Sequence, residues 1–295
     1  MTSCPEPGIY YDIPNAVYQA WNAVSNSRLG WFTKSASTYR YYLANPKDAT
    51  DEMKIGTAVH GIVLTPGDSD VVVCPEVNRR TKDGKAEWSA FLAENANKTV
   101  LTHEQYTKAV EMSQAVLYDP VCANVLAQAT EREVSIVFDW PLPDRDPIRC
   151  KARIDMALKE IGYIADLKTA SDASPDGFSK AIWNWGLYRQ AGFYCRGASL
   201  AGYMDPEQFL FVTVDSGPAK NPPYNTACYV LDHDAILFGS LEAEDLLCGL
   251  SDCIASDTWP SYADEVQSVG LPPWAIRKMR ERGYTDIVEQ TKEGE

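Results

Sequence analysis

The chain has 295 residues, of which 45% are hydrophobic and 23% are charged, the composition of an ordinary globular protein. No apolar run approaches the roughly 20 residues of a membrane helix, and the first seven residues lack the basic and apolar parts of a signal peptide, so we expect a cytoplasmic protein with no membrane partner. The net charge of −14 excludes a surface that is basic all over, but it leaves room for a basic groove on an acidic body.

Residues 1–128 have mostly helical patterns. Residues 18–29 predict a helix followed by a second helix start capped by Ser25 or Ser27. Residues 51–64 place apolar side chains at helical spacing, and the short β-branched run at 71–74 predicts an isolated strand. A capping box that begins at Thr102 opens a helix to about Leu117.

Residues 77–87 are polar, and we expect them to be a mobile segment. They contain four basic side chains, at Arg79, Arg80, Lys82 and Lys85. Two interpretations stay open, a solvated loop and a loop that contacts DNA.

The pattern changes near residue 131. Three stretches, 133–138, 148–156 and 161–168, alternate apolar and polar residues and are joined by short connections, which predicts an antiparallel meander. A helix at 186–202, strands at 209–214 and 227–231, and a helix at 232–255 follow. The order predicts an α/β (α+β) fold with a sheet flanked by helices. We expect one domain over 1–258, helical over 1–128 and with its core at 129–258, and a tail over 259–295 that contains a short basic helix from Trp274 to Arg282.

Two carboxylates occupy corresponding places on consecutive strands of this meander. If the chain turns near residues 160 and 161, Asp155 lies opposite Asp166, and alternation puts Lys168 on the same face. The face of Asp155 also carries cations, at Arg149, Lys151 and Arg153. Close carboxylates repel each other unless a cation lies between them, and hard oxygen ligands favour Mg²⁺, with Mn²⁺ able to substitute. Lys168 would orient or deprotonate a water molecule beside such an ion.

These residues resemble a known family. Asp155 followed by Asp166-Leu167-Lys168 is similar to the core motif of the PD-(D/E)xK nucleases. Gly56 to His60 matches the GxxxH helix motif of their RecB/RecE-like branch, and Gln190 to Tyr194 matches its QxxxY motif. Four further segments look like the RecE-type (exodeoxyribonuclease VIII) enzymes of phages and prophages: 18–21, 24–29, 39–42 and 222–224. The resemblance runs from about residue 15 to 255 and implies a restriction-endonuclease-like core with a mixed central sheet.

The resemblance implies roles for individual residues. Metal ligands would be the side chains of His60, Asp155 and Asp166 together with the Leu167 carbonyl. Lys168 would be catalytic, and Glu133 would hold a second metal or its water, although a surface carboxylate is an equal alternative. Gln190 and Tyr194, one helical turn apart, would orient Lys168 or contact the substrate phosphate, or else only pack their helix on the sheet.

The implied activity is a Mg²⁺-dependent exonuclease that degrades linear double-stranded DNA from its ends, 5′ to 3′, and exposes single strands for recombination. Enzymes of this branch are ring-shaped tetramers that work beside a single-strand annealing protein. No GxxxxGK[ST] loop occurs, so we expect no use of ATP. The eight cysteines include no CxxC pair, so we expect no iron–sulfur cluster. Two alternatives stay open: a structure-specific or restriction-like endonuclease, and a catalytically silent module that binds DNA ends.

Overall fold

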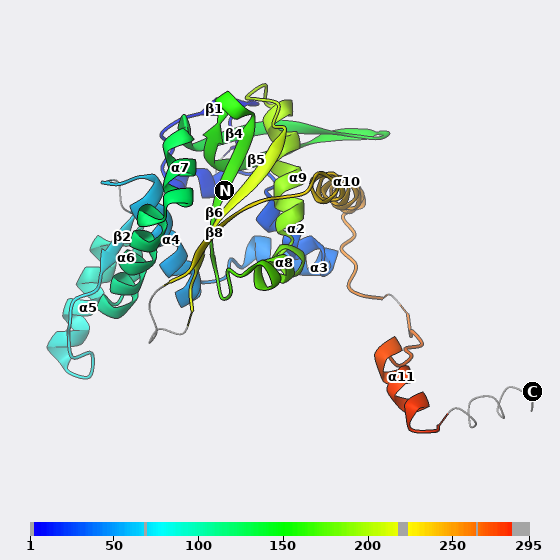
Figure 1. The fold of residues 1–295 in the computed structure, drawn as a ribbon. Helices are drawn as coiled ribbons and strands as arrows, with labels where there is room; N and C mark the ends of the chain where they lie inside the picture. The colour runs from blue at the N-terminus through cyan, green and yellow to red at the C-terminus, as the bar shows by residue number, and fades with distance from the viewer. Residues whose placement is uncertain (1–2, 68–69, 218–223, 264, 285–295) are drawn as a thin grey trace, which may run out of the picture. The chain divides into compact units, whose positions relative to one another are not determined.

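A computed structural model describes residues 3–67, 70–217, 224–263 and 265–284 (Figure 1). The chain divides into two compact units, Met1–Trp259 and Pro260–Glu295. Of the segment 222–224, singled out above, residues 222 and 223 lie outside the described residues. No helix among the described residues is long and apolar enough to cross a membrane.

The first unit is built on a mixed sheet, which has six strands within the described residues, in the order β1-β4-β5-β6-β7-β8. All neighbouring strands are antiparallel except β6 and β7, which are parallel. The predicted antiparallel meander is therefore confirmed as β4-β5-β6, and the predicted α/β class with it. The strands are β1 (Gly8–Tyr10), β4 (Glu131–Leu142), β5 (Arg145–Leu158), β6 (Tyr163–Ala170), β7 (Gln208–Asp215) and β8 (Thr226–Val230).

The β5–β6 connection sets the register of the site. The chain turns through a short 3-10 helix, Lys159–Ile161, and Gly162 follows with φ 70°, a left-handed conformation that glycine adopts without steric cost. The paired residues of β5 and β6 run from Leu158↔Tyr163 to Met156↔Ala165. Asp155 and Asp166 are the next residues on the two strands, and the Leu167 N–H bonds Asp155 Oδ2 at 2.9 Å, so the strands still lie side by side there.

Helices cover both faces of the sheet, and each face has its own hydrophobic core. One core joins the middle of β4 and β5 to α9 and α10, with Trp140 stacked on Phe193 at 5.4 Å between ring centroids. The other joins β6 and β7 to α4, α6 and α7. The helices of the first unit are α1 (Asn15–Ala20), α2 (Asn26–Phe32), α3 (Ala36–Ala44), α4 (Asp51–Leu64), α5 (Lys82–Glu94), α6 (His103–Tyr118), α7 (Pro120–Gln128), α8 (Pro175–Asn184), α9 (Leu187–Leu200) and α10 (His233–Ser256).

The long helices α9 and α10 cross at two glycines. A Cβ added to Gly239 would lie 1.9 Å from the main-chain oxygen of Tyr188, and one added to Gly192 would lie 2.1 Å from the main-chain nitrogen of Ser240. Contacts that short do not occur between real atoms, so only glycine allows the two backbones to approach this closely. The crossing holds α9, which carries Gln190, against the rest of the core.

The first predicted helix is shorter than expected. It ends at Ala20, and Val24 pairs with Cys150 alongside β5, although Ser25 does cap α2 as predicted. The cause is Lys151, whose buried Nζ donates to the main-chain oxygens of Tyr18 at 2.6 Å and Trp21 at 3.0 Å. These bonds take up carbonyls that a longer helix would have used.

Two further expectations were wrong in the N-terminal part. The strand β2 (Val71–Val73) is not isolated, because it pairs in parallel with β3 (Thr99–Leu101). The polar segment 77–87 is not a mobile loop throughout, because helix α5 begins within it, at Lys82. By contrast, α4 has the predicted bounds, and the capping box at Thr102 is formed.

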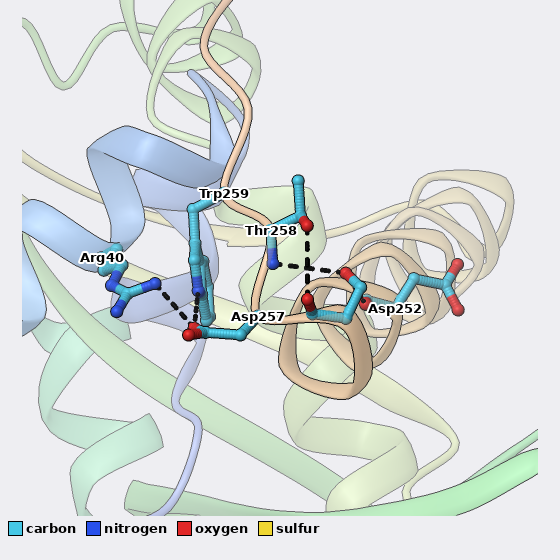
Figure 2. A network of polar contacts seen from close by, with 6 residues as sticks. Arg40, Asp252, Asp257, Thr258 and Trp259 are labelled. Carbon is cyan, nitrogen blue, oxygen red and sulfur yellow. Dashed lines mark hydrogen bonds and ion pairs between the residues drawn. The ribbon is translucent and has the colours of Figure 1, made fainter.

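A cluster of polar and aromatic side chains lies at the C-terminal end of the first unit (Figure 2). Helix α10 ends at Ser256 and is followed by its C-cap Asp257, whose φ of 48° is left-handed. Oδ1 of Asp257 accepts from Arg40 Nη1 at 2.7 Å and from Trp259 Nε1 at 2.9 Å. The Trp259 ring stacks on Tyr39 with an interplanar angle of 2°. The second unit contains α11 (Pro273–Glu281), within one residue of the predicted basic helix.

Candidate active site

Among the described residues, one group of side chains brings potential metal-binding atoms close together. His60, Glu133 and Asp155 each offer one such atom, and these atoms lie within 4.8 Å of one another. His60 Nδ1 is 3.5 Å from Asp155 Oδ2, and both side chains are largely buried. An imidazole and two carboxylates on three different elements are therefore directed at one point.

Helix α4 delivers His60 from outside the sheet. Gly56, one turn earlier, faces β6: a Cβ at this position would lie 3.2 Å from Thr169 Oγ1, tighter than ordinary contact. A glycine here therefore lets the helix lie close to the strand that carries Asp166 and Lys168. The GxxxH spacing thus has a packing reason, since the glycine sets the distance of the helix and the histidine points into the site.

Glu133 reaches the site through an unusual backbone. Its φ is 53°, left-handed, inside an otherwise extended strand, and the pairing register skips it between Arg132↔Met156 and Val134↔Ile154. Such a conformation costs a non-glycine residue on the order of 1–3 kcal/mol, and it is found where function holds it in place. Burial raises the pKa of Glu133 to about 7, and the neighbouring charge of Asp155 contributes to the rise.

Asp166 and Lys168 form an ion pair beside this group. Lys168 Nζ lies 2.5 Å from Asp166 Oδ2, and Asp166 Oδ1 accepts a hydrogen bond from Gln190 Nε2 at 2.5 Å. Oδ2 is buried, and it is in contact with the Lys168 ammonium group. Gln190 thus contacts Asp166, the ion-pair partner of Lys168, and its role in orienting Lys168 or contacting the phosphate stays a prediction.

Burial and the attraction between the two groups shift the pKa of each member of this pair in opposite directions. Burial raises the pKa of Asp166 to about 6, against the attraction of Lys168. Burial by itself lowers the pKa of Lys168, but the negative charges of Asp166 and Asp155 outweigh it and the net shift is upward. In this state Lys168 is therefore an ammonium group that neutralises the carboxylates rather than a free base.

Leu167 and Tyr194 complete the predicted set. The main-chain N–H of Leu167 donates to Asp155 Oδ2 at 2.9 Å, which fixes that carboxylate across the two strands. That the main-chain carbonyl of Leu167 binds the metal stays a prediction. Burial raises the pKa of Tyr194, and Tyr18 and Asp166 add to the rise, so its hydroxyl belongs to the same acidic region. Its ring packs against Phe209 of β7.

The cations expected on the face of Asp155 serve mainly other purposes. Arg149 pairs with Asp139, and Lys151 is buried under residues 18–21. Arg153 donates to Ser135 Oγ and the Ile13 carbonyl, and its guanidinium also lies 3.8 Å from Glu133 Oε2. Arg153 is therefore the one of these three that touches the site, a role that alternation along the strand could not distinguish.

The residues present fit a divalent cation. The group contains carboxylate oxygens, the donors that Mg²⁺ and Mn²⁺ prefer, and one imidazole nitrogen, which transition-metal ions accept more readily than Mg²⁺ does. Asp166 lies near this group, since the charges of Asp155 and His60 both influence its pKa. The three carboxylates Glu133, Asp155 and Asp166 outnumber the two cations beside them, Lys168 and Arg153, so the arrangement favours further bound positive charge.

Comparison with known proteins places the fold. The crystal structure of a candidate exonuclease from Eubacterium rectale matches with a TM-score of 0.55 and 10% identity, over 86% of this chain and 92% of that one. A phage-related exonuclease from Haemophilus somnus 129PT matches with a TM-score of 0.31 and 13% identity, over 68% of this chain and 94% of that one, a similarity too low to argue from. No protein of curated function matches the sequence.

A family model covers most of the chain. Residues 25–272 match the model described as a PDDEXK-like domain of unknown function (DUF3799). The matched range includes every residue of the site, from His60 to Tyr194. This agrees with the resemblance seen in the sequence, and family and fold together support a hydrolytic nuclease. The chain belongs to this family of PDDEXK-like domains.

Proposed function

We propose that this protein is a Mg²⁺-dependent exonuclease that degrades linear double-stranded DNA from its ends in the 5′ to 3′ direction, exposing single strands for recombination. The observation that carries the proposal is the convergence of His60, Glu133 and Asp155 within 4.8 Å, next to the Asp166–Lys168 pair. A binding module that did no chemistry would have no use for this set of buried charges.

The metal would be held by His60 and Asp155, with Glu133 and Asp166 as further carboxylate ligands. When bound, a divalent cation supplies positive charge beside the scissile phosphate and lowers the pKa of a water molecule. The chain's own residues supply the rest. Leu167 N–H holds the Asp155 carboxylate in place, Gln190 orients Asp166, and Lys168 places an ammonium group where negative charge develops on the phosphate.

As part of the proposal, the chain acts as a ring-shaped tetramer beside a single-strand annealing protein. The support is the sequence resemblance together with the net charge of −14, since a ring can turn acidic faces outward and basic faces toward DNA. Mass measurement in solution tests the assembly by itself.

The decisive experiment uses end-labelled linear duplex DNA and closed circular DNA of the same sequence, with Mg²⁺ or with EDTA. We expect loss of the linear DNA only with Mg²⁺, release of the 5′ label first, and an intact circle. Cleavage of the circle would favour an endonuclease. Absence of cleavage with Mg²⁺ and with Mn²⁺ would leave only a binding role.

Two variants separate metal binding from chemistry. Lys168→Ala should abolish cleavage while Mg²⁺ and Mn²⁺ still raise the melting temperature, because it leaves the ligands in place. His60→Ala should remove most of that rise. If Mn²⁺ stabilises His60→Ala as strongly as the parent protein, this metal site is wrong.

A further inference from the structure

The first turn of α5 and the segment before it carry a dense positive charge. Arg79, Arg80, Lys82 and Lys85 lie within seven residues that contain a single acid, Asp83, in a chain of net charge −14. All four cations are exposed, and within the described part of the chain none of them forms an ion pair. We call these four residues the basic turn.

The basic turn has a defined shape. The main-chain oxygen of Asn78 accepts from Thr81 N at 3.1 Å and from Thr81 Oγ1 at 3.0 Å, and Thr81 Oγ1 accepts from Gly84 N at 3.0 Å. A Cβ at Gly84 would lie 2.1 Å from the Asn78 oxygen, so only glycine lets the segment fold back on the helix. The exposed cations therefore project from a bonded turn rather than from a loose loop.

One cation is also held by an aromatic ring. The Arg79 guanidinium lies 3.9 Å from the centre of the Trp88 ring, and Trp88 stacks with Phe91 at 5.8 Å. Stacking of this kind restricts the guanidinium and leaves its rim of N–H groups for acceptors. Because Arg79 covers the indole, Trp88 is not free to stack on a nucleobase, so this surface fits phosphates better than bases.

The helix that follows stands away from the core. Gly84 is buried, whereas the other residues of α5 are exposed or half-buried, and α5 lies at the lower left of Figure 1, far from the six-stranded sheet. A charged surface at a distance from the catalytic group can contact only an extended substrate. A duplex that enters the site from one end is such a substrate, since it carries phosphates along its whole length.

We propose that the basic turn binds the phosphate backbone of duplex DNA, without sequence preference, at a distance from the nucleotide being cleaved. This inference rests on the proposed function and adds to it a substrate contact outside the metal site. Arg80, Lys82 and Lys85 make direct contacts with phosphates, and Arg79 contributes a contact held in place by Trp88.

The test compares two triple variants that remove the same number of charges. Arg80→Ala/Lys82→Ala/Lys85→Ala removes three cations of the basic turn, and Arg277→Ala/Lys278→Ala/Arg280→Ala removes three exposed cations of α11. Affinity for a blunt duplex of random sequence is measured against salt concentration, with Lys168→Ala added to every protein to prevent cleavage. In the parent protein, log affinity should fall steeply with log salt concentration. The basic-turn variant should make this slope shallower by about 2 to 3, and the α11 variant should leave the slope unchanged.

Without Lys168→Ala, the basic-turn variant should raise KM for linear duplex about tenfold or more and leave kcat unchanged. Equal losses in the two variants, an unchanged salt slope in the first, or a loss confined to single-stranded DNA would each overturn the inference. Failure of the parent protein to bind duplex would instead count against the proposed function. If the melting temperature of the alanine variant falls, the matching glutamine variant takes its place.

Discussion

The main-chain N–H of Leu167 donates a hydrogen bond to Oδ2 of Asp155 over 2.9 Å, joining β6 to the carboxylate of β5. Asp155 is thus held by the backbone of the strand that carries Asp166 and Lys168. Because the bond needs only an acceptor oxygen, the charge of Asp155 can be removed separately from its hydrogen bond.

Asp155→Asn should therefore keep the fold and lose the chemistry. The amide oxygen can still accept from Leu167, so the melting temperature should stay close to that of the parent protein. Cleavage of linear duplex should fall at least about a hundredfold, equal to roughly 2.7 kcal/mol of activation free energy. Asp155→Ala serves as the comparison, since it leaves a buried N–H without its partner and should cost about 1–3 kcal/mol of stability as well. An Asp155→Asn enzyme of normal rate would contradict the assignment.

Gln190 contacts Asp166, and under the proposed function it acts through that carboxylate, which its substitution tests. Gln190→Ala frees Asp166 Oδ1 from its hydrogen bond, and we expect kcat to fall roughly 10- to 100-fold, the usual effect of losing a residue that orients a metal ligand. KM for DNA should change little, because the side chain points at a carboxylate. A rise in KM with unchanged kcat would show instead that Gln190 contacts the DNA. Gln190→Glu should be at least as impaired, because it places two carboxylates together.

The helix crossing at Gly239 should be intolerant of even one added carbon. Gly239→Ala would put its Cβ 1.9 Å from the Tyr188 oxygen, so α9 and α10 must move apart, at a cost of about 1–3 kcal/mol or more in the free energy of unfolding. Urea denaturation measures the loss. Gly61→Ala is the matched control, since a Cβ there meets nothing within 4 Å and should raise the stability of α4. Equal effects at the two positions would contradict this account of the crossing.

The cap of α7 gives a pH dependence with a definite sign. The Cys122 N–H, with that of Val121, donates to Asp119 and lowers the pKa of this carboxyl below its ordinary value of 3.8. A lowered folded-state pKa means that the charged cap stabilises the protein above the unfolded pKa and that this stabilisation is lost as the pH falls through the folded one. The melting temperature of Asp119→Asn should therefore lie below that of the parent at pH 7, and the two should converge below pH 4. A constant difference would contradict the ionic part of the cap.

Sequence patterning could predict the parts of the site that depend on alternation and periodicity. The Asp155 and Asp166 strands, their turn near residue 160 and the helix carrying Gln190 follow from local patterns alone. The burial of Lys151 does not follow from local patterns, because the carbonyls to which its Nζ donates lie about 130 residues earlier in the chain. The same limit applies to Glu133, since no local signal marks one glutamate of a strand as left-handed.

Helix α5 was missed for a different reason. The large apolar side chains of Lys82–Glu94 are confined to its second half, at Trp88, Phe91 and Leu92, and the helix buries little, so the sequence of its polar first half indicates a loop. Its start is encoded instead by the N-cap Thr81, whose Oγ1 accepts from the N–H of Gly84 in the first turn, and by Gly84 itself, which lets Asn78 approach. The roles implied for Leu167 and Tyr194 stay predictions, because they depend on a bound metal and a substrate.

The left-handed backbone of Glu133 implies that this protein is less stable than the same fold would be without its candidate active site. A residue with φ of 53° and a buried acidic group is a poor choice for a strand that only had to fold. Random mutagenesis that selected for heat resistance alone, with no demand for cleavage, should accordingly replace this glutamate early, most readily by glycine. Selection for nuclease activity should restore it.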